Sequence, residues 1–101
     1  MKLLFAPEAL EDMENIYRYY AEHNERHAVE LYNEIIDEAK YLQRFPFLAQ
    51  KEPLLEEFPE TYYSLVVWRY YKLVYFIEND TINVVTVFDC RQNPETLKKR
   101  L

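Results

Sequence analysis

The fold of this chain is decided by residues Tyr62–Pro94, YYSLVVWRYYKLVYFIENDTINVVTVFDCRQNP. Tyrosine, valine, isoleucine and phenylalanine suit a pleated, half-buried surface. The stretch therefore predicts three consecutive strands, Tyr62–Val67, Tyr70–Ile77 and Ile82–Asp89. Only two to four residues separate one strand from the next, so both connections must be tight turns, which favours an antiparallel meander. One face of such a sheet must be covered, and the N-terminal half of the chain has to supply the cover.

That N-terminal half predicts one short strand and two helices. Lys2–Phe5 is the strand, and Pro7 suits the first helical position, where its missing N–H would be unpaired anyway. Apolar residues then recur at spacings of three and four as far as about Glu22. Asn24 is a suitable N-cap for a second helix that runs to about Arg44. Two helices joined by so short a turn form an antiparallel hairpin, which can cover the sheet.

The remaining segments are less regular. Phe47–Thr61 contains two prolines and four acidic residues, and we interpret it as a loop with at most one helical turn, at Leu54–Phe58. Glu95–Leu101 predicts a short helical tail. The order β-α-α-β-β-β predicts one α+β domain over residues 1–101, with a helical hairpin packed on a mainly antiparallel sheet.

Composition excludes several classes of function. The chain contains no glycine, which rules out glycine-rich phosphate loops and dinucleotide-binding fingerprints, and we expect no cofactor. Its net charge of −6 disfavours broad contact with a phosphate backbone. We expect no metal site, because Glu78, Asp80 and Asp89 lack a recognised ligand spacing.

The sequence also predicts a cytoplasmic protein with no membrane partner. No run approaches the roughly 18 apolar residues of a membrane span. The apolar run Leu3–Ala6 is shorter than the roughly 7 to 15 residues of a signal-peptide core. A single cysteine, Cys90, cannot form an internal disulfide and suits a reducing compartment. We interpret Cys90 as a packed thiol at a strand end.

Four segments carry a family resemblance: PEALEDMENIYRYY (Pro7–Tyr20), LQRFP (Leu42–Pro46), YYKLVYFIEND (Tyr70–Asp80) and FDCRQNPETL (Phe88–Leu97). In this order they resemble the RelE/ParE superfamily of type II toxin–antitoxin systems, whose members are often called plasmid-stabilisation proteins. The resemblance covers essentially the whole chain and implies a RelE/ParE-like fold with a cognate antitoxin as partner. RelE-like members cleave mRNA on the ribosome, whereas ParE-like members inhibit DNA gyrase. The resemblance is also compatible with a homodimer.

Part of the ribonuclease residue set is present. RNA cleavage needs cations that stabilise the extra negative charge of the transition state. The resemblance implies this role for Lys72 and Arg91, with Arg69 as a further phosphate clamp. Lys72 lacks the bidentate fork of an arginine. The alternative for Arg91 is an ion pair with Asp89 or with acids of the preceding loop.

The set of side chains that could transfer a proton during RNA cleavage is incomplete. Leu97 stands where ribonuclease-type members have a tail tyrosine, and Tyr63 stands where relatives commonly have an arginine. We interpret His23 and His27, at the helix junction, as solvated residues distant from Arg91. The acidic loop before Tyr63 also repels RNA phosphate.

We therefore predict a ParE-like toxin that binds a protein target such as DNA gyrase and is neutralised by an antitoxin. Two alternatives stay open: a RelE-like mRNA interferase using Lys72, Arg91 and Arg69, and a degenerate toxin without activity. Trp68, Arg69, Arg91 and Asp89 are the expected binding residues, since an aromatic beside a cation at a turn is typical of interface hot spots. For Trp68 and Arg69 the alternative is a turn folded over the edge of the core.

Overall fold

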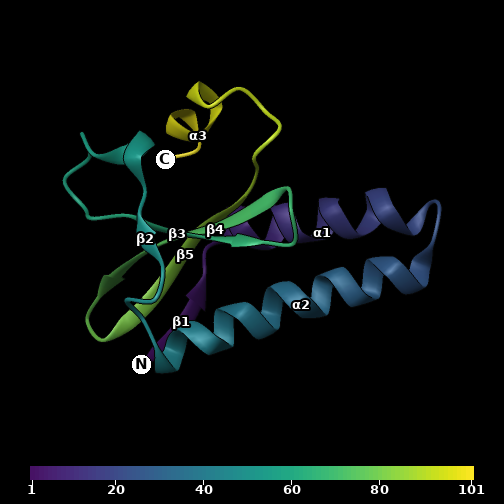
Figure 1. The fold of residues 1–101 in the computed structure, drawn as a ribbon, viewed down its shortest axis with the longest axis horizontal. Helices are drawn as coiled ribbons and strands as arrows, with labels where there is room; N and C mark the ends of the chain where they lie inside the picture. The colour runs from purple at the N-terminus through teal and green to yellow at the C-terminus, as the bar shows by residue number, and fades with distance from the viewer.

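The computed structural model describes residues 1–101 and is built around one five-stranded sheet (Figure 1). Its strands are β1 (Lys2–Phe5), β2 (Gln50–Lys51), β3 (Tyr63–Val67), β4 (Tyr71–Glu78) and β5 (Thr81–Asp89), in the spatial order β1-β5-β4-β3-β2. The predicted antiparallel meander is confirmed, with each strand boundary within one residue of its expected place. β1 pairs with β5 in parallel, which a chain that returns through two helices permits.

The two turns of the meander adopt left-handed backbone angles without any glycine. Asn79 and Asp80 have φ of 53° and 57° in the β4–β5 turn, where short polar side chains tolerate this conformation. Trp68 has φ of 57° in the β3–β4 turn, which is unusual for a bulky residue. The conformation at Trp68 must therefore be held by the packing of its side chain.

Helices α1 (Pro7–Ala21) and α2 (Glu25–Arg44) form the predicted hairpin on one face of the sheet. Pro7 occupies the start of α1, and the Asn24 side chain accepts a hydrogen bond from the His27 backbone N–H at 3.2 Å. The main core lies between the hairpin and the sheet. It contains Ala9, Met13, Leu31, Ile35, Leu73, Tyr75, Ile82 and Val84, among others. Figure 1 shows the α1–α2 turn extending beyond the sheet.

A smaller cover lies on the other face of the sheet. It consists of the 3₁₀ turn η1 (Pro53–Leu55) and the tail helix α3 (Glu95–Lys99). Alternation along β4 explains the two cores, because Leu73 faces the helical hairpin while Val74 faces this cover. The second core contains Leu55, Tyr62, Val74, Phe88 and Leu97.

The segment expected to be a loop holds more structure than predicted. β2 pairs with β3 through Gln50 opposite Ser64 and Lys51 opposite Tyr63. The helical turn is 3₁₀ and begins at Pro53, one residue before the expected start. β2 has no sequence signature, because it is only two residues long and both are polar and exposed. None of the helices is both long enough and apolar enough to cross a membrane.

Candidate functional site at the end of β5

The predicted site residues lie on two different faces of the sheet. Asp89 and Arg91, at the end of β5, contact Tyr71 of β4, whose side chain belongs to the core under the helical hairpin. Lys72, the next residue of β4, points to the opposite face, towards Glu52 of the loop before η1. Arg69 is exposed in the β3–β4 turn and forms no ion pair. The three cations of the interferase hypothesis therefore do not converge on one point.

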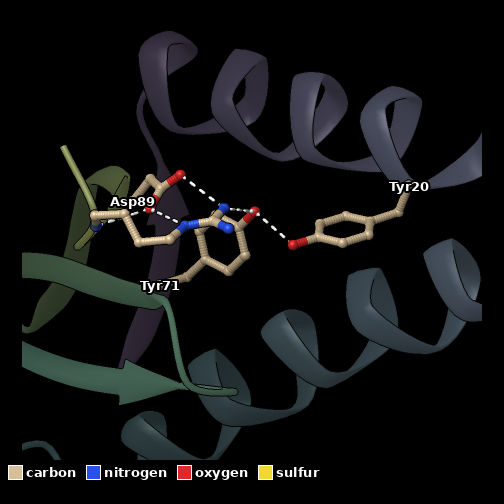
Figure 2. A network of polar contacts seen from close by, with 4 residues as sticks. Tyr20, Tyr71 and Asp89 are labelled. Atoms are coloured by element: carbon tan, nitrogen blue, oxygen red, sulfur yellow. Dashed lines mark hydrogen bonds and ion pairs between the residues drawn. The ribbon is translucent and has the colours of Figure 1, made fainter.

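Arg91 is held by Asp89 through three hydrogen bonds (Figure 2). The Arg91 backbone N–H and Nε donate to Asp89 Oδ1 at 2.9 and 3.0 Å, and an Arg91 terminal nitrogen donates to Oδ2 at 3.0 Å. These hydrogen bonds hold the pKa of Asp89 below its ordinary value and raise the pKa of Arg91. The alternative expected for Arg91, an ion pair with Asp89, is the arrangement found.

Two tyrosines extend this network into the helical hairpin. An Arg91 terminal nitrogen donates to the Tyr71 hydroxyl at 3.5 Å, and the Tyr71 hydroxyl donates to the Tyr20 hydroxyl at 3.2 Å (Figure 2). The guanidinium also lies 4.5 Å from the ring centroid of Tyr70, within cation–π range. Burial raises the pKa of Tyr71, so its phenol stays protonated at neutral pH. Tyr71 is therefore suited to orient Arg91 rather than to accept a proton.

The β3–β4 turn is folded back against the hairpin instead of projecting into solvent. The Trp68 ring lies 5.6 Å from that of Tyr20 and 5.2 Å from that of His27, and it stacks on Tyr71 at 6.4 Å. Trp68 is thus half-buried, which is the second of the two arrangements expected for this turn. The interpretation of His27 as a solvated residue is wrong. Its position four residues before Leu31, on the apolar stripe of α2, is the sequence signal for its inward orientation.

Lys72 is neutralised within the protein. Its Nζ forms an ion pair with Glu52 Oε1, and the two side chains are only 14% and 2% exposed. The other carboxylate oxygen of Glu52 accepts a hydrogen bond from the Leu54 N–H at 3.1 Å, so Glu52 also caps η1. In the sequence Glu52 is one of four acids in the loop before Tyr63, and no local pattern distinguishes it from the other three. Leu97, which the resemblance places where ribonuclease-type members have a tail tyrosine, is fully buried in the second core.

A cleft of about 500 Å³ lies between α1 and the end of β5, and both Arg91 and Arg100 line it. Asp12 of α1 forms an ion pair with Arg100 and accepts hydrogen bonds from Thr86 Oγ1 at 2.5 Å and from the Val87 N–H at 3.0 Å. β1 pairs with β5 only as far as Val84, so Asp12 supplies the partner that Val87 lacks. Both arginines of the cleft are therefore already paired with acids.

The cleft contains no cluster of metal ligands, and the single cysteine of the chain does not line it. The chain contains no group of three or more His, Cys, Asp or Glu residues placed to hold a metal ion. Cys90 is exposed, so its interpretation as a packed thiol is wrong. Partial burial nevertheless raises the pKa of its thiol, which keeps it largely protonated near neutral pH.

Comparison with solved structures identifies related folds. The chromosomal ParDE toxin–antitoxin system from P. aeruginosa contains a chain that superposes with a TM-score of 0.73 at 20% identity, covering 88% of this chain and 95% of that one. The YoeB dimer and the YoeB–YefM complex from Staphylococcus aureus match with TM-scores of 0.59 and 0.55. Both are 22% identical and cover 86% of this chain and 93% of theirs. At these identities the similarity shows a shared fold.

Comparison of sequences gives the family. No curated protein matches the sequence. A family model described as "ParE toxin of type II toxin-antitoxin system, parDE" matches residues 3–94, almost the whole chain. That match covers the helical hairpin, the complete meander and the Asp89–Arg91 network. The chain therefore belongs to the ParE toxin family of type II toxin–antitoxin systems, within the RelE/ParE superfamily.

Proposed function

We propose that this toxin acts in the cytoplasm by binding a protein target, with DNA gyrase as the target that its family indicates, and that it does not cleave RNA. The observation that carries the proposal is the internal pairing of Lys72 with Glu52. A cation that stabilises a developing charge has to be available to the substrate. Lys72 is only 14% exposed and is paired with the buried Glu52, and Arg91, on the other face, is held by Asp89.

The groups that would move a proton are equally unsuited to ribonuclease chemistry. The tail position is occupied by Leu97, which has no titratable group and is fully buried. The Tyr71 phenol has a raised pKa and donates a hydrogen bond to the Tyr20 hydroxyl. His27 is packed between Tyr20 and Trp68. These contacts support a role in binding rather than in acid–base catalysis.

In this proposal a cognate antitoxin holds the toxin inactive. The structural matches support such a partner, because they include a ParDE toxin–antitoxin system and a YoeB–YefM complex. Arg69 is the target-binding candidate with the fewest internal contacts, since it is exposed and unpaired. The conformation of the surface next to Arg69 is fixed by Trp68, Asp89 and Arg91.

A RelE-like mRNA interferase is the second candidate, and one observation favours it. Arg91 lies over the ring of Tyr70 and 3.5 Å from the hydroxyl of Tyr71, which places a cation beside two phenols at an open cleft. RNA cleavage uses such a combination of charge and hydroxyl groups. Lys72 would have to leave Glu52 to take part. A degenerate toxin, which keeps the fold and lacks activity, is the third possibility.

Induced expression without antitoxin tests the proposal, with pulse-labelling of DNA and protein synthesis in the same culture. We expect DNA synthesis to fall first, with double-strand breaks and intact translation. The double variant E52Q/K72M removes the buried ion pair without leaving a lone charge, and it should keep this effect. Early loss of protein synthesis that disappears in E52Q/K72M would instead support the interferase. Normal growth with folded protein present would support the degenerate toxin.

A further inference from the structure

Large apolar side chains are exposed together where α2 ends. Of the eleven large hydrophobic residues that are exposed in this protein, four lie between residues 41 and 48. They are Tyr41, Phe45, Phe47 and Leu48, with exposed fractions of 48%, 45%, 67% and 58%. The rings of Tyr41 and Phe45 lie 5.0 Å apart, and the Leu48 N–H donates to the Phe45 carbonyl at 3.1 Å, which closes the turn after α2. We call these four residues the α2-end patch.

A pocket adjoins this patch. Its volume is about 450 Å³, and its apolar walls are formed by Phe47, Tyr63, Phe76 and Ile77. Phe47 belongs to both the patch and the pocket, and its ring lies 5.9 Å from that of Tyr63. A two-fold symmetric contact needs a surface that is complementary to itself, because both copies present the same residues. An exposed apolar patch beside an apolar pocket meets that requirement.

Charges of opposite sign flank the patch and the pocket. Residues 39–51 contain no acid and three basic residues, Lys40, Arg44 and Lys51. Glu60 and Glu78 line the pocket. All five residues are exposed, and none of them forms an ion pair within the molecule. A second copy related by a two-fold axis can place its acids against the basic residues of the first, so the surface is complementary in charge as well as in shape.

The acidic surface of the protein lies elsewhere. Residues 7–38 contain ten acidic and two basic residues, whereas the remainder of the chain contains eight acidic and ten basic ones. Figure 1 shows the α1–α2 turn and the C-terminal end of α2 towards opposite ends of the molecule. Two copies joined at the α2-end patch therefore direct much of their acid-rich segments away from each other, which limits the repulsion between them.

The exposed area of the patch suits the core of an interface. The four exposed fractions together amount to about two complete side chains, on the order of 400 Å². Each partner of a standard interface buries roughly 800 Å², of which somewhat more than half is apolar. The patch therefore accounts for most of the apolar share, and the pocket walls and the flanking charges supply the remainder.

We propose that this protein forms a two-fold symmetric dimer through the α2-end patch. The patch of each copy packs on the pocket of the other, and the basic segment of residues 39–51 lies against the acids of the opposite pocket. A second copy is favoured over an unrelated protein because both halves of the contact are present on one surface. The inference goes beyond the proposed function, since self-association requires neither a target nor an antitoxin, and the two can fail separately.

Sedimentation velocity of the purified, full-length toxin across a concentration series tests for the dimer. We expect a monomer–dimer equilibrium in which the dimer predominates at roughly 100 μM, as a micromolar dissociation constant requires. A monomer at every concentration would overturn the inference and would leave the patch to a different partner.

Polar substitutions test whether the patch forms the contact. The variant F47Q/L48Q should raise the dissociation constant at least roughly tenfold, because it removes the two most exposed apolar side chains of the patch. The matched control V29Q/V66T changes two apolar residues that are 41% and 61% exposed outside the patch, and it should dimerise like the wild type. An unchanged dissociation constant in F47Q/L48Q, or equal weakening in both variants, would contradict the proposal.

Charge reversal tests the two-fold arrangement by loss and recovery of the dimer. K40E/R44E makes the basic side of the contact acidic, and E60K/E78K makes its acidic side basic. We expect each variant alone to be monomeric at a concentration where the wild type is a dimer, because like charges then face each other. An equimolar mixture of the two variants should dimerise again, since opposite charges meet at both contacts. Recovery in the mixture also shows that both variants are folded.

Two results would refute this arrangement. Variants that still dimerise alone would show that these charges lie outside the contact. A mixture that stays monomeric, although circular dichroism shows both variants to be folded, would show that the basic and acidic sides do not face each other.

Discussion

At the scale of single residues, the Lys72–Glu52 pair removes a cation from the surface of the sheet. Glu52 is buried and Lys72 is largely covered, and Glu52 also accepts a hydrogen bond from the Leu54 N–H. A buried ion pair adds little net stability over an apolar pair, but the loss of one partner leaves an uncompensated charge. The ion pair with Glu52 therefore explains why Lys72, which stands at the position of a nuclease cation, is unavailable to phosphate.

The substitution Glu52→Gln should be strongly destabilising. It leaves the Lys72 ammonium buried without a counter-charge, and we expect a loss of about 3–5 kcal/mol in the free energy of unfolding. Urea denaturation followed by far-UV circular dichroism measures the change. The double variant E52Q/K72M should recover most of the loss, and E56Q, on an exposed acid of the same segment, should change stability by less than about 0.5 kcal/mol. Similar losses in E52Q and E52Q/K72M would contradict the ion-pair explanation.

Asp89 should contribute a pH-dependent part of the stability. Hydrogen bonds from Arg91 lower its pKa below the ordinary value of 3.8. A carboxylate with a lowered pKa stabilises the fold above the pKa of the unfolded chain, and this stabilisation is lost as the pH falls through the folded pKa. The difference in free energy of unfolding between wild type and D89N should therefore be constant above about pH 5 and shrink below about pH 4. Denaturation at a series of pH values measures it, and a difference independent of pH would refute the assignment.

Trp68 and His27 show why single residues were hard to assign from the sequence. A tryptophan in a two-residue turn fits both an exposed hot spot and a packed corner, and the two differ only in what lies opposite. The opposite surface is formed by Tyr20 and His27, which are more than 40 residues away along the chain. Local patterns contain no information about such a neighbour.

At the scale of elements, the tail helix α3 packs against the second face of the sheet. Leu97 packs with Leu55, Val74 and Phe88, while Lys98 and Arg100 pair with Glu57 and Asp12 at its periphery. The five residues of α3 are too few to be stable as an isolated helix. The tail is therefore held by tertiary contacts, with Leu97 as the central one.

The substitution Leu97→Ala should loosen this tail and lower the stability of the whole domain. It removes a completely buried side chain and leaves a cavity, for which we expect about 2–5 kcal/mol. Thermal unfolding and amide hydrogen exchange of α3 measure the effect. Leu101→Ala, at a position that is 40% exposed, is the matched control and should cost less than about 1 kcal/mol. Unchanged hydrogen exchange of α3 in L97A would contradict the claim that Leu97 holds this helix on the sheet.

The elements that were predicted correctly are those with strong periodic patterns. α1, α2 and the three strands of the meander contain repeated apolar residues and recognisable caps or turns, so their boundaries follow from local physics. β2 has no such pattern, because it forms where a loop passes close to β3. Its existence depends on a neighbour that the local sequence does not contain.

At the scale of the whole molecule, charge is segregated between the helical hairpin and the rest. Several acids of α2 stand three or four residues apart, where like charges repel, as in Glu30, Glu34 and Glu38. This repulsion opposes helix formation, and the core under the hairpin has to offset it. The hairpin therefore carries its surface charge at a cost in stability.

Removal of hairpin acids should therefore stabilise the free toxin. We expect E11Q/E34Q/D37N to raise the free energy of unfolding by roughly 1 kcal/mol at low salt, summed from about 0.2–0.5 kcal/mol per relieved repulsion. The gain should shrink at high salt because the charges are exposed and screened. Thermal unfolding at two salt concentrations measures it, with E56Q/E60Q/E78Q as the control of equal net charge. A similar gain in the control would attribute the effect to net charge rather than to its location.

The sequence by itself determined the order of the elements, the α+β class, the antiparallel meander and the likeness to RelE/ParE toxins. Each of these depends on periodicity, caps, turns and motifs within short windows. Only the tertiary structure decided which positive charges are available to a ligand. Lys72 forms an ion pair with Glu52, Arg91 with Asp89, and Arg100 with Asp12. It also decided that Trp68 packs on Tyr20 and that the α2-end patch lies beside an apolar pocket. The physical reason is that ion pairing, burial and concavity depend on distances between residues far apart in sequence, which become defined only when the chain is folded.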